Sequence, residues 1–287
     1  MNSIDIESKK FLGQPKNFVS IFNALLFDGQ PVLKPEYLKD ENSELVMNVS
    51  SKHVDIIKRY EDGTYLDLFV IESQSYVDQC MVARVMEYEC VARMRYIRQN
   101  FKKHVPMHTR LPMILTVVLY VGESKWNAAK RLSELEIIHP GFEDMFNEFK
   151  LNLIELNTNH KYNTGEKATQ DFFDLLRMIY RKQILKEDLD REFNRDALYF
   201  AYVVTKNKEL LNIYQESEKG DVKVCRALDE MFEESTNKGI QMGIKHSIAL
   251  NQFEVYQTTL DKGFSVKAIA SIFSVSEESI KTLLMKA

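Results

Sequence analysis

The stretch SKHVDIIKRYEDGTYLDLFVIESQ, residues 51–74, decides the fold that this sequence predicts. Its two halves are rich in β-branched and aromatic residues, and the dipeptide Asp62-Gly63 separates them. An Asp-Gly pair between two such segments is typical of a tight hairpin turn, because these residue types tolerate a positive φ. We therefore expect an antiparallel hairpin with strands over 51–60 and 65–74, in which Asp62 and Gly63 form a two-residue loop.

Acidic residues of the two strands fall on one face of this hairpin. In the expected register Asp55 lies opposite Val70, and side chains alternate between faces, so Asp55, Glu72 and Gln74 point the same way. Two carboxylates on such diagonal positions have backbones roughly 7 to 8 Å apart and could hold one cation between them. Oxygen ligands without a cysteine or histidine cluster favour Mg²⁺ or Mn²⁺ over zinc. A turn of odd length would break this arrangement.

The segments around the hairpin complete an α/β core, which we expect over residues 1–185. Apolar residues at three- and four-residue steps predict helices, one of which begins at a capping residue, Asp78. The run Leu111 to Tyr120 is apolar at nearly every position, as expected for a strand buried on both faces in the centre of a sheet. The expected helices are 17–28, 78–100 and 172–183, and the expected further strands are 111–120 and 149–156. This order predicts a mixed central sheet flanked by helices.

Beyond about residue 186 the pattern predicts helices and no strand. Two helices are expected over 197–214 and 222–234, separated by a polar break. Ser265 and Ser276 are expected to cap two short helices near the end of the chain. We therefore expect an all-helical extension over 186–245 and a small unit resembling a helix-turn-helix over 246–287.

The composition is that of an ordinary globular protein, with 45% hydrophobic and 28% charged residues among 287. No apolar run approaches the roughly 18 to 20 residues that span a bilayer, and the polar start lacks a secretion signal, so we expect a cytoplasmic protein with no membrane segment. The three cysteines lack CxxC spacing, which favours reduced thiols over a disulfide or zinc framework. The net charge of −4 argues against a protein that coats nucleic acid through bulk electrostatics.

An ordered set of motifs resembles one known family. Asp55 followed by Glu72-x-Gln74 looks like the D…(D/E)-x-K signature of PD-(D/E)xK nucleases in an E-x-Q form. Its companions are FNALLF at 22–27, a helix with Arg84 and Tyr88, and VLYVG at 118–122 followed by Trp126. Over residues 10–245 the chain is similar to the Rpn family of recombination-promoting nucleases and transposases within the PD-(D/E)xK superfamily.

The resemblance implies a restriction-endonuclease-like core and a magnesium-dependent DNA endonuclease, a bacterial hydrolase connected with recombination or mobile-element DNA. It implies that Asp55 and Glu72 are metal ligands, with the main-chain carbonyl of Ser73 as a third. Gln74 stands where the superfamily has a lysine. A glutamine can hydrogen-bond the attacking water or a phosphate oxygen, but it brings no positive charge.

The resemblance also implies supporting residues and partners. Asn23, Arg84 and Tyr88 are candidates for contacting DNA or supporting the site, although Arg84 and Tyr88 could equally pack against the sheet. DNA is the expected partner, and the helical C-terminal region could form a homo-oligomer. The last short helix carries few basic residues, so the terminal unit could dock a protein as readily as DNA. The alternative function is a weakened nuclease fold that binds DNA or a protein partner without cutting.

Overall fold

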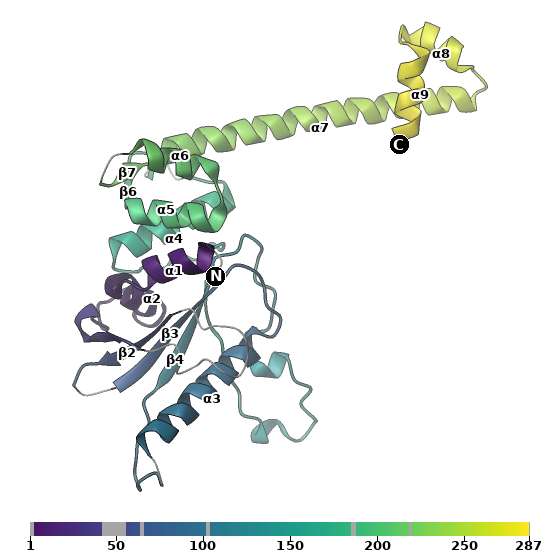
Figure 1. Ribbon diagram of the computed structural model, residues 1–287. Helices are drawn as coiled ribbons and strands as arrows, with labels where there is room; N and C mark the ends of the chain where they lie inside the picture. Colours follow the sequence, from purple (N-terminus) through teal and green to yellow (C-terminus); the bar gives the residue numbers. More distant parts are fainter. Residues whose placement is uncertain are drawn as a thin grey trace. The chain divides into compact units, whose positions relative to one another are not determined.

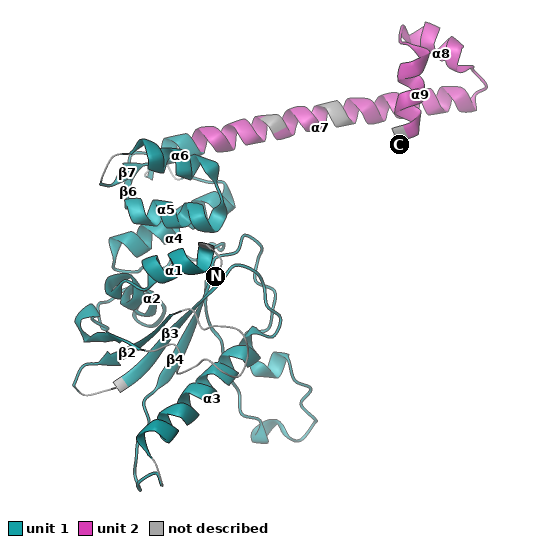
Figure 2. Cartoon of the chain, viewed as in Figure 1, with its two compact units in different colours: residues 1–228 teal, residues 229–287 magenta. Residues whose placement is uncertain are grey.

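The computed structural model describes residues 3–41, 56–63, 66–101, 104–184, 188–217 and 220–286. The chain forms two compact units, residues 1–228 and 229–287 (Figure 2). The finer division of the chain at residues 185 and 245 stays a prediction.

A mixed five-stranded sheet forms the centre of the first unit within the described ranges (Figure 1). Its strands lie side by side in chain order, so neighbours in sequence are neighbours in space. They are β1 (Leu38–Asp40), β2 (Ile56–Glu61), β3 (Leu66–Gln74), β4 (Ile114–Tyr120) and β5 (Asn152–Glu155). β1, β2 and β3 pair antiparallel, whereas β4 runs parallel to both β3 and β5. The predicted mixed sheet is therefore confirmed, and β4 lies inside it with six of its seven residues buried.

The hairpin of β2 and β3 has a longer loop than the sequence predicted. Ile57 pairs with Val70, and the pair nearest the turn is Glu61 with Leu66, so four residues separate the strands instead of two. The expected pairing of Asp55 with Val70 is wrong for this reason, and Asp55 itself lies outside the described residues. The register differs by two residues, an even step, so it does not change which described side chains share a face.

Helices cover the two faces of the sheet (Figure 1). α3 (Met81–Asn100) packs on the face formed by Leu68 and Val70, where Tyr88 and Ala92 meet these side chains in one apolar cluster. α2 (Pro15–Phe27) covers the opposite face, and the ring of Phe22 stacks on that of Phe69 with centroids 4.8 Å apart. Because successive β3 side chains alternate, even-numbered residues of β3 face α3 and odd-numbered residues face α2.

Aromatic packing joins further helices to the α2 side. Phe11 at the end of α1 (Ser3–Leu12) lies 5.0 Å from Phe200 and 5.6 Å from Phe172 between ring centroids. The other helices among the described residues of this unit are α4 (Lys167–Arg181), α5 (Arg195–Thr205), α6 (Lys208–Glu216) and the start of α7 (Cys225–Asp261). Short 3-10 turns are η1 (Pro35–Tyr37), η3 (Leu132–Glu134) and η4 (Glu143–Met145). The single helix expected over 197–214 is two helices, because Lys206 adopts a positive φ and Asn207 caps a new helix.

A charged cluster under α4 holds the connection to α5. The side chain of Asp171 is 1% exposed, and it accepts hydrogen bonds from Arg191 and from the main-chain N–H of Asn194. Arg191 also pairs with Asp174 at 2.8 Å. This cluster flanks β6 (Glu192–Phe193), which pairs antiparallel with β7 (Val222–Lys223). The expectation of an all-helical region beyond residue 186 is therefore wrong here, because strands of two residues are too short to show alternation.

The second unit consists of most of α7 with α8 (Val266–Phe273) and α9 (Glu277–Lys286). Tyr256, Ile269 and Ile280 meet in its small core. The predicted caps are confirmed, since Ser265 accepts a hydrogen bond from the N–H of Ala268 and Ser276 accepts one from Ser279. Within the part of the chain that the structure describes, no helix has the length and apolar character needed to cross a membrane.

Replacing Arg191 by alanine should lower the free energy of unfolding by about 2 kcal/mol, because two buried carboxylates lose a charged hydrogen-bond donor while they keep Lys167 and Arg177 as partners. Urea denaturation measures the change. Arg226 offers a matched control: its pair with Asp190 is 73% and 70% exposed, and Arg226→Ala should change stability by less than about 0.5 kcal/mol. Equal effects of the two substitutions would contradict the role given to the cluster.

Candidate functional site

Glu72 carries a buried carboxylate on the face of the sheet that α3 covers. It lies near the carboxyl end of β3, pairs in register with Val118 of β4, and is only 4% exposed. A buried carboxylate is costly unless a cation or hydrogen-bond donors compensate its charge. The carboxylate of Glu72 therefore needs a partner inside the protein.

Arg84, in the first turn of α3, compensates this charge. Its Nη2 lies 3.2 Å from Oε1 of Glu72, and the side chains are 17% and 6% exposed. The guanidinium also pairs with Asp78, just before α3, and donates to the hydroxyl of Tyr88 at 2.8 Å. The structure thus brings together three predicted site residues, Glu72, Arg84 and Tyr88. Asp78, expected as the helix cap, instead holds Arg84 and accepts a hydrogen bond from the N–H of Cys80.

Gln74 shares the face of Glu72, two residues further along β3. Its side chain is 4% exposed, and its Nε2 has no hydrogen-bond partner among the described residues. Buried polar atoms in native proteins almost always have a partner, often water or a ligand. The Nε2 of Gln74 is therefore a candidate donor to a bound water or ligand. Ser73 lies between the two, in register with Leu119, and its side chain belongs to the opposite face.

On this face the described residues offer one carboxylate as an oxygen ligand for a hard cation, that of buried Glu72. The Nε2 of Gln74, a buried donor without a partner among the described residues, could donate to a water bound to such a cation. Among the described residues there is no group of three or more His, Cys, Asp or Glu side chains that could hold a metal ion. Asp55, the predicted second carboxylate, lies outside these residues and directly precedes Ile56, which pairs with Ile71 beside Glu72.

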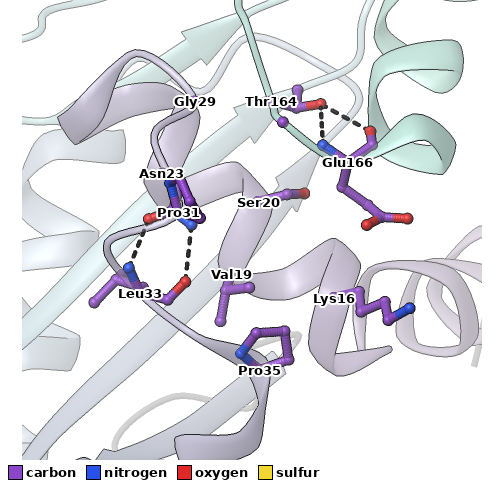
Figure 3. Close-up of a pocket in the computed structure, with 11 residues that line it drawn as sticks. Lys16, Val19, Ser20, Asn23, Gly29, Pro31, Leu33, Pro35, Thr164 and Glu166 are labelled. Carbon is purple, nitrogen blue, oxygen red and sulfur yellow. Dashed lines mark hydrogen bonds between the residues drawn. The ribbon is translucent and has the colours of Figure 1, made fainter.

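Asn23 is placed elsewhere. It belongs to α2, on the other face of the sheet. Its side-chain Nδ2 donates a hydrogen bond to the carbonyl oxygen of Leu33, and its Oδ1 accepts one from the N–H of Leu33, both at 2.9 Å. It lines a pocket of about 130 Å³ between α2 and the start of α4, which Lys16 and Glu166 also border (Figure 3). The structure does not bring Asn23 together with Glu72, and its hydrogen bonds indicate that it orders the loop after α2.

The loop after β4 packs tightly against the end of β3. A side chain at Gly122 would lie 2.7 Å from the carbonyl oxygen of Ser75, so only glycine allows this approach. Trp126 packs edge-on against Tyr120, with centroids 5.1 Å apart, and its main-chain N–H donates to Glu155. These contacts order the loop in which Trp126 lies. They fix the backbone next to Gln74, whose carbonyl accepts a hydrogen bond from Val121.

Glu89 is a second buried acid of this face, and sequence reasoning missed it. It is 6% exposed, accepts a hydrogen bond from the N–H of Thr116 at 3.0 Å, and pairs with Arg93. The signal was present, because Glu89 interrupts the apolar stripe that Val85 and Ala92 form on α3. Burial raises the pKa of Glu89 above its ordinary value, and the hydrogen bonds and Arg93 offset this only in part.

The raised pKa of Glu89 makes a pH-dependent contribution to stability. The folded protein holds this proton more tightly than the unfolded chain, so the contribution is complete below about pH 4.5 and is lost as the pH rises through the folded pKa. Glu89→Gln cannot ionise. Its stability relative to the wild type should therefore increase as the pH rises above about 4.5, as urea denaturation over a pH series would measure. A difference between the two proteins that does not vary with pH would contradict this assignment.

Comparison with known proteins gives one family match. The model of the family described as "Putative transposase, YhgA-like" matches residues 36–210, which include the whole sheet and the Glu72 face. No curated protein and no solved structure was found to be similar to the chain.

Proposed function

The chain belongs to the family described as "Putative transposase, YhgA-like", and we propose that its Glu72 face hydrolyses DNA phosphodiester bonds with the help of a divalent cation. The family match indicates a function connected with mobile elements. The finer proposal, a DNA endonuclease with a PD-(D/E)xK core, draws support from the order of elements. An antiparallel hairpin, a helix and a parallel strand follow one another, and the E-x-Q residues end the hairpin.

The observation that carries the proposal is the buried pair of Glu72 and Gln74. A protein that used this face for packing alone would gain stability from apolar side chains there, because buried polar groups must be compensated. Here Glu72 requires Arg84, and Gln74 leaves Nε2 without a partner among the described residues. Such a cost is expected where a site binds a polar substrate.

The residues would divide the chemistry as follows. Asp55, Glu72 and the main-chain carbonyl of Ser73 would hold Mg²⁺ or Mn²⁺. When bound, the cation polarises the phosphate and lowers the pKa of the attacking water. Gln74 would orient that water or a phosphate oxygen by donating from Nε2, and Arg84 and Tyr88 would support the site. Water attacks the phosphorus, one P–O ester bond breaks, and the leaving oxygen takes up a proton.

A second candidate function rests on the neutral charge of Gln74. A site that lacks the superfamily lysine has less stabilisation for a developing negative charge, so the protein could bind DNA or a protein partner without cutting it. The two candidates separate in one experiment. A folded protein that binds DNA in an electrophoretic shift, yet leaves it intact with Mg²⁺ and with Mn²⁺, would establish the second.

Purified wild-type protein should nick plasmid DNA with Mg²⁺ or Mn²⁺ and not with EDTA. Asp55→Ala and Glu72→Ala should each lower the cleavage rate by more than about 100-fold, beyond the effect of losing an outer-shell partner. Gel densitometry over time measures the rates. Glu61→Gln is the matched control, since Glu61 is an acid at the other end of β2 that pairs with Lys39 at the surface.

Residual cutting that is equal in wild type and in both variants would contradict the proposal, because a contaminating nuclease would then account for it. Thermal unfolding should show that every variant is folded before its rate is compared.

The partner that we propose for α7 is a second copy of the chain. Ile240, Ile244, Ile248 and Val255 lie along one side of this helix at helical spacing, and each is between 43% and 55% exposed. Light scattering should show a dimer or larger assembly for the wild type, and a smaller one for the variant with Ile244→Glu and Ile248→Glu. A wild-type monomer, or a variant with unchanged mass, would contradict this proposal.

A further inference from the structure

The side chain of Arg84, in the first turn of α3, makes an unusually large number of polar contacts. Three side chains from different parts of the chain fix its guanidinium: Glu72 on β3, Asp78 before α3, and Tyr88 one turn further along α3. Tyr88 accepts from both Nε, at 3.2 Å, and Nη2, at 2.8 Å, and its ring lies beneath the guanidinium, 5.7 Å from its central carbon. A side chain fixed in this way presents its charge in one place.

The guanidinium of Arg84 lies on the face of the sheet where a positive charge is missing at position 74. The E-x-Q form leaves the strand without the cation of an E-x-K form, because Gln74 is neutral. Arg84 brings a positive charge to the same face from α3, 3.2 Å from the carboxylate of Glu72. A guanidinium stays protonated at every physiological pH, so the charge is permanent. Asp78 also pairs with Arg84, so the guanidinium bridges the carboxylate of Glu72 in the site and that of Asp78 at its edge.

We propose that Arg84 is a positioning residue that orients Glu72 for the cation and supplies, from α3, the positive charge that a lysine at position 74 would bring. This inference rests on the proposed function. Outer-shell partners that hydrogen-bond a ligating carboxylate fix its orientation, and their loss weakens metal binding. Tyr88 acts through Arg84, because its hydroxyl accepts two of the guanidinium hydrogen bonds.

The first measurement is Mn²⁺ binding to the full chain by titration calorimetry, without DNA. Arg84→Gln should weaken Mn²⁺ affinity by about 10- to 100-fold. Arg93→Gln is the matched control, because Arg93 lies on the same helix and pairs with a different buried acid, Glu89, at 3.4 Å. It removes the same charge from α3 and should leave the affinity within about twofold of the wild type, consistent with a partner outside the Glu72 cluster.

The second measurement tests the charge itself. Gln74→Lys should recover at least tenfold of the DNA cleavage that Arg84→Gln loses, a larger factor than the same substitution gives in the chain that retains Arg84. Such non-additivity is the signature of two groups that serve one role. Thermal unfolding checks that each variant is folded. If Arg84→Gln does not fold, Tyr88→Phe is the test. This variant keeps the charge of Arg84 but removes the hydroxyl that accepts its hydrogen bonds, and it should weaken Mn²⁺ affinity at least threefold.

The outcomes separate this inference from the function on which it rests. Wild-type protein that neither binds Mn²⁺ nor cuts DNA overturns both. Wild-type protein that does both, with Arg84→Gln binding Mn²⁺ as tightly or more tightly, overturns the role of Arg84 alone and shows that it merely competes with the metal. Failure of Gln74→Lys to recover cleavage in the Arg84→Gln chain overturns the charge replacement.

Discussion

The carboxylate of Glu72 must be compensated inside the protein, and the structure around it follows from this constraint. β3 places Glu72 on the face that α3 covers, where it is nearly inaccessible to water. Arg84 of α3 forms an ion pair with this carboxylate, and Asp78 and Tyr88 fix the position of the arginine. The ion pair therefore couples the end of β3 to the first turns of α3. A pair of this kind adds little net stability compared with apolar packing, and this supports the functional role that we propose for Glu72.

The rest of the first unit gives this site a rigid frame. Parallel pairing of β3 with β4 places Glu72 beside Val118 and Gln74 beside Tyr120. The close approach of Gly122 to the main chain of Ser75 holds the loop after β4 against the end of β3. On the other face, stacked aromatic rings and the hydrogen bonds of Asn23 join the sheet to α2. A site on strand ends that are fixed from both faces can hold its geometry while a charged substrate binds.

Much of this frame is visible in the sequence, and the exceptions have physical causes. Strong periodicity predicts α2, α3, β3 and β4, and the strand alternation places Glu72 and Gln74 on one face. The loop length of the hairpin was wrong, because Asp62-Gly63 signals a turn and does not fix how many residues close it. β1, β6 and β7 are too short for alternation, and α1 begins in a polar stretch. Ion pairs between distant residues, such as Arg191 with Asp171, leave no local pattern at all.

The sequence likewise predicts some features of the site and not others. Sequence spacing indicates that Arg84 and Tyr88 share a helix face, as their hydrogen bond requires, but the hydrogen bond from Arg84 to Glu72 depends on how α3 crosses the sheet. Asn23 fits the motif by sequence and lies on the other face in the structure. The most direct test of the account is anomalous diffraction from crystals of the full chain grown with Mn²⁺. The account predicts an anomalous peak from a Mn²⁺ ion held by Glu72 and Asp55. A crystal grown at a saturating Mn²⁺ concentration that shows no peak beside Glu72 would contradict it.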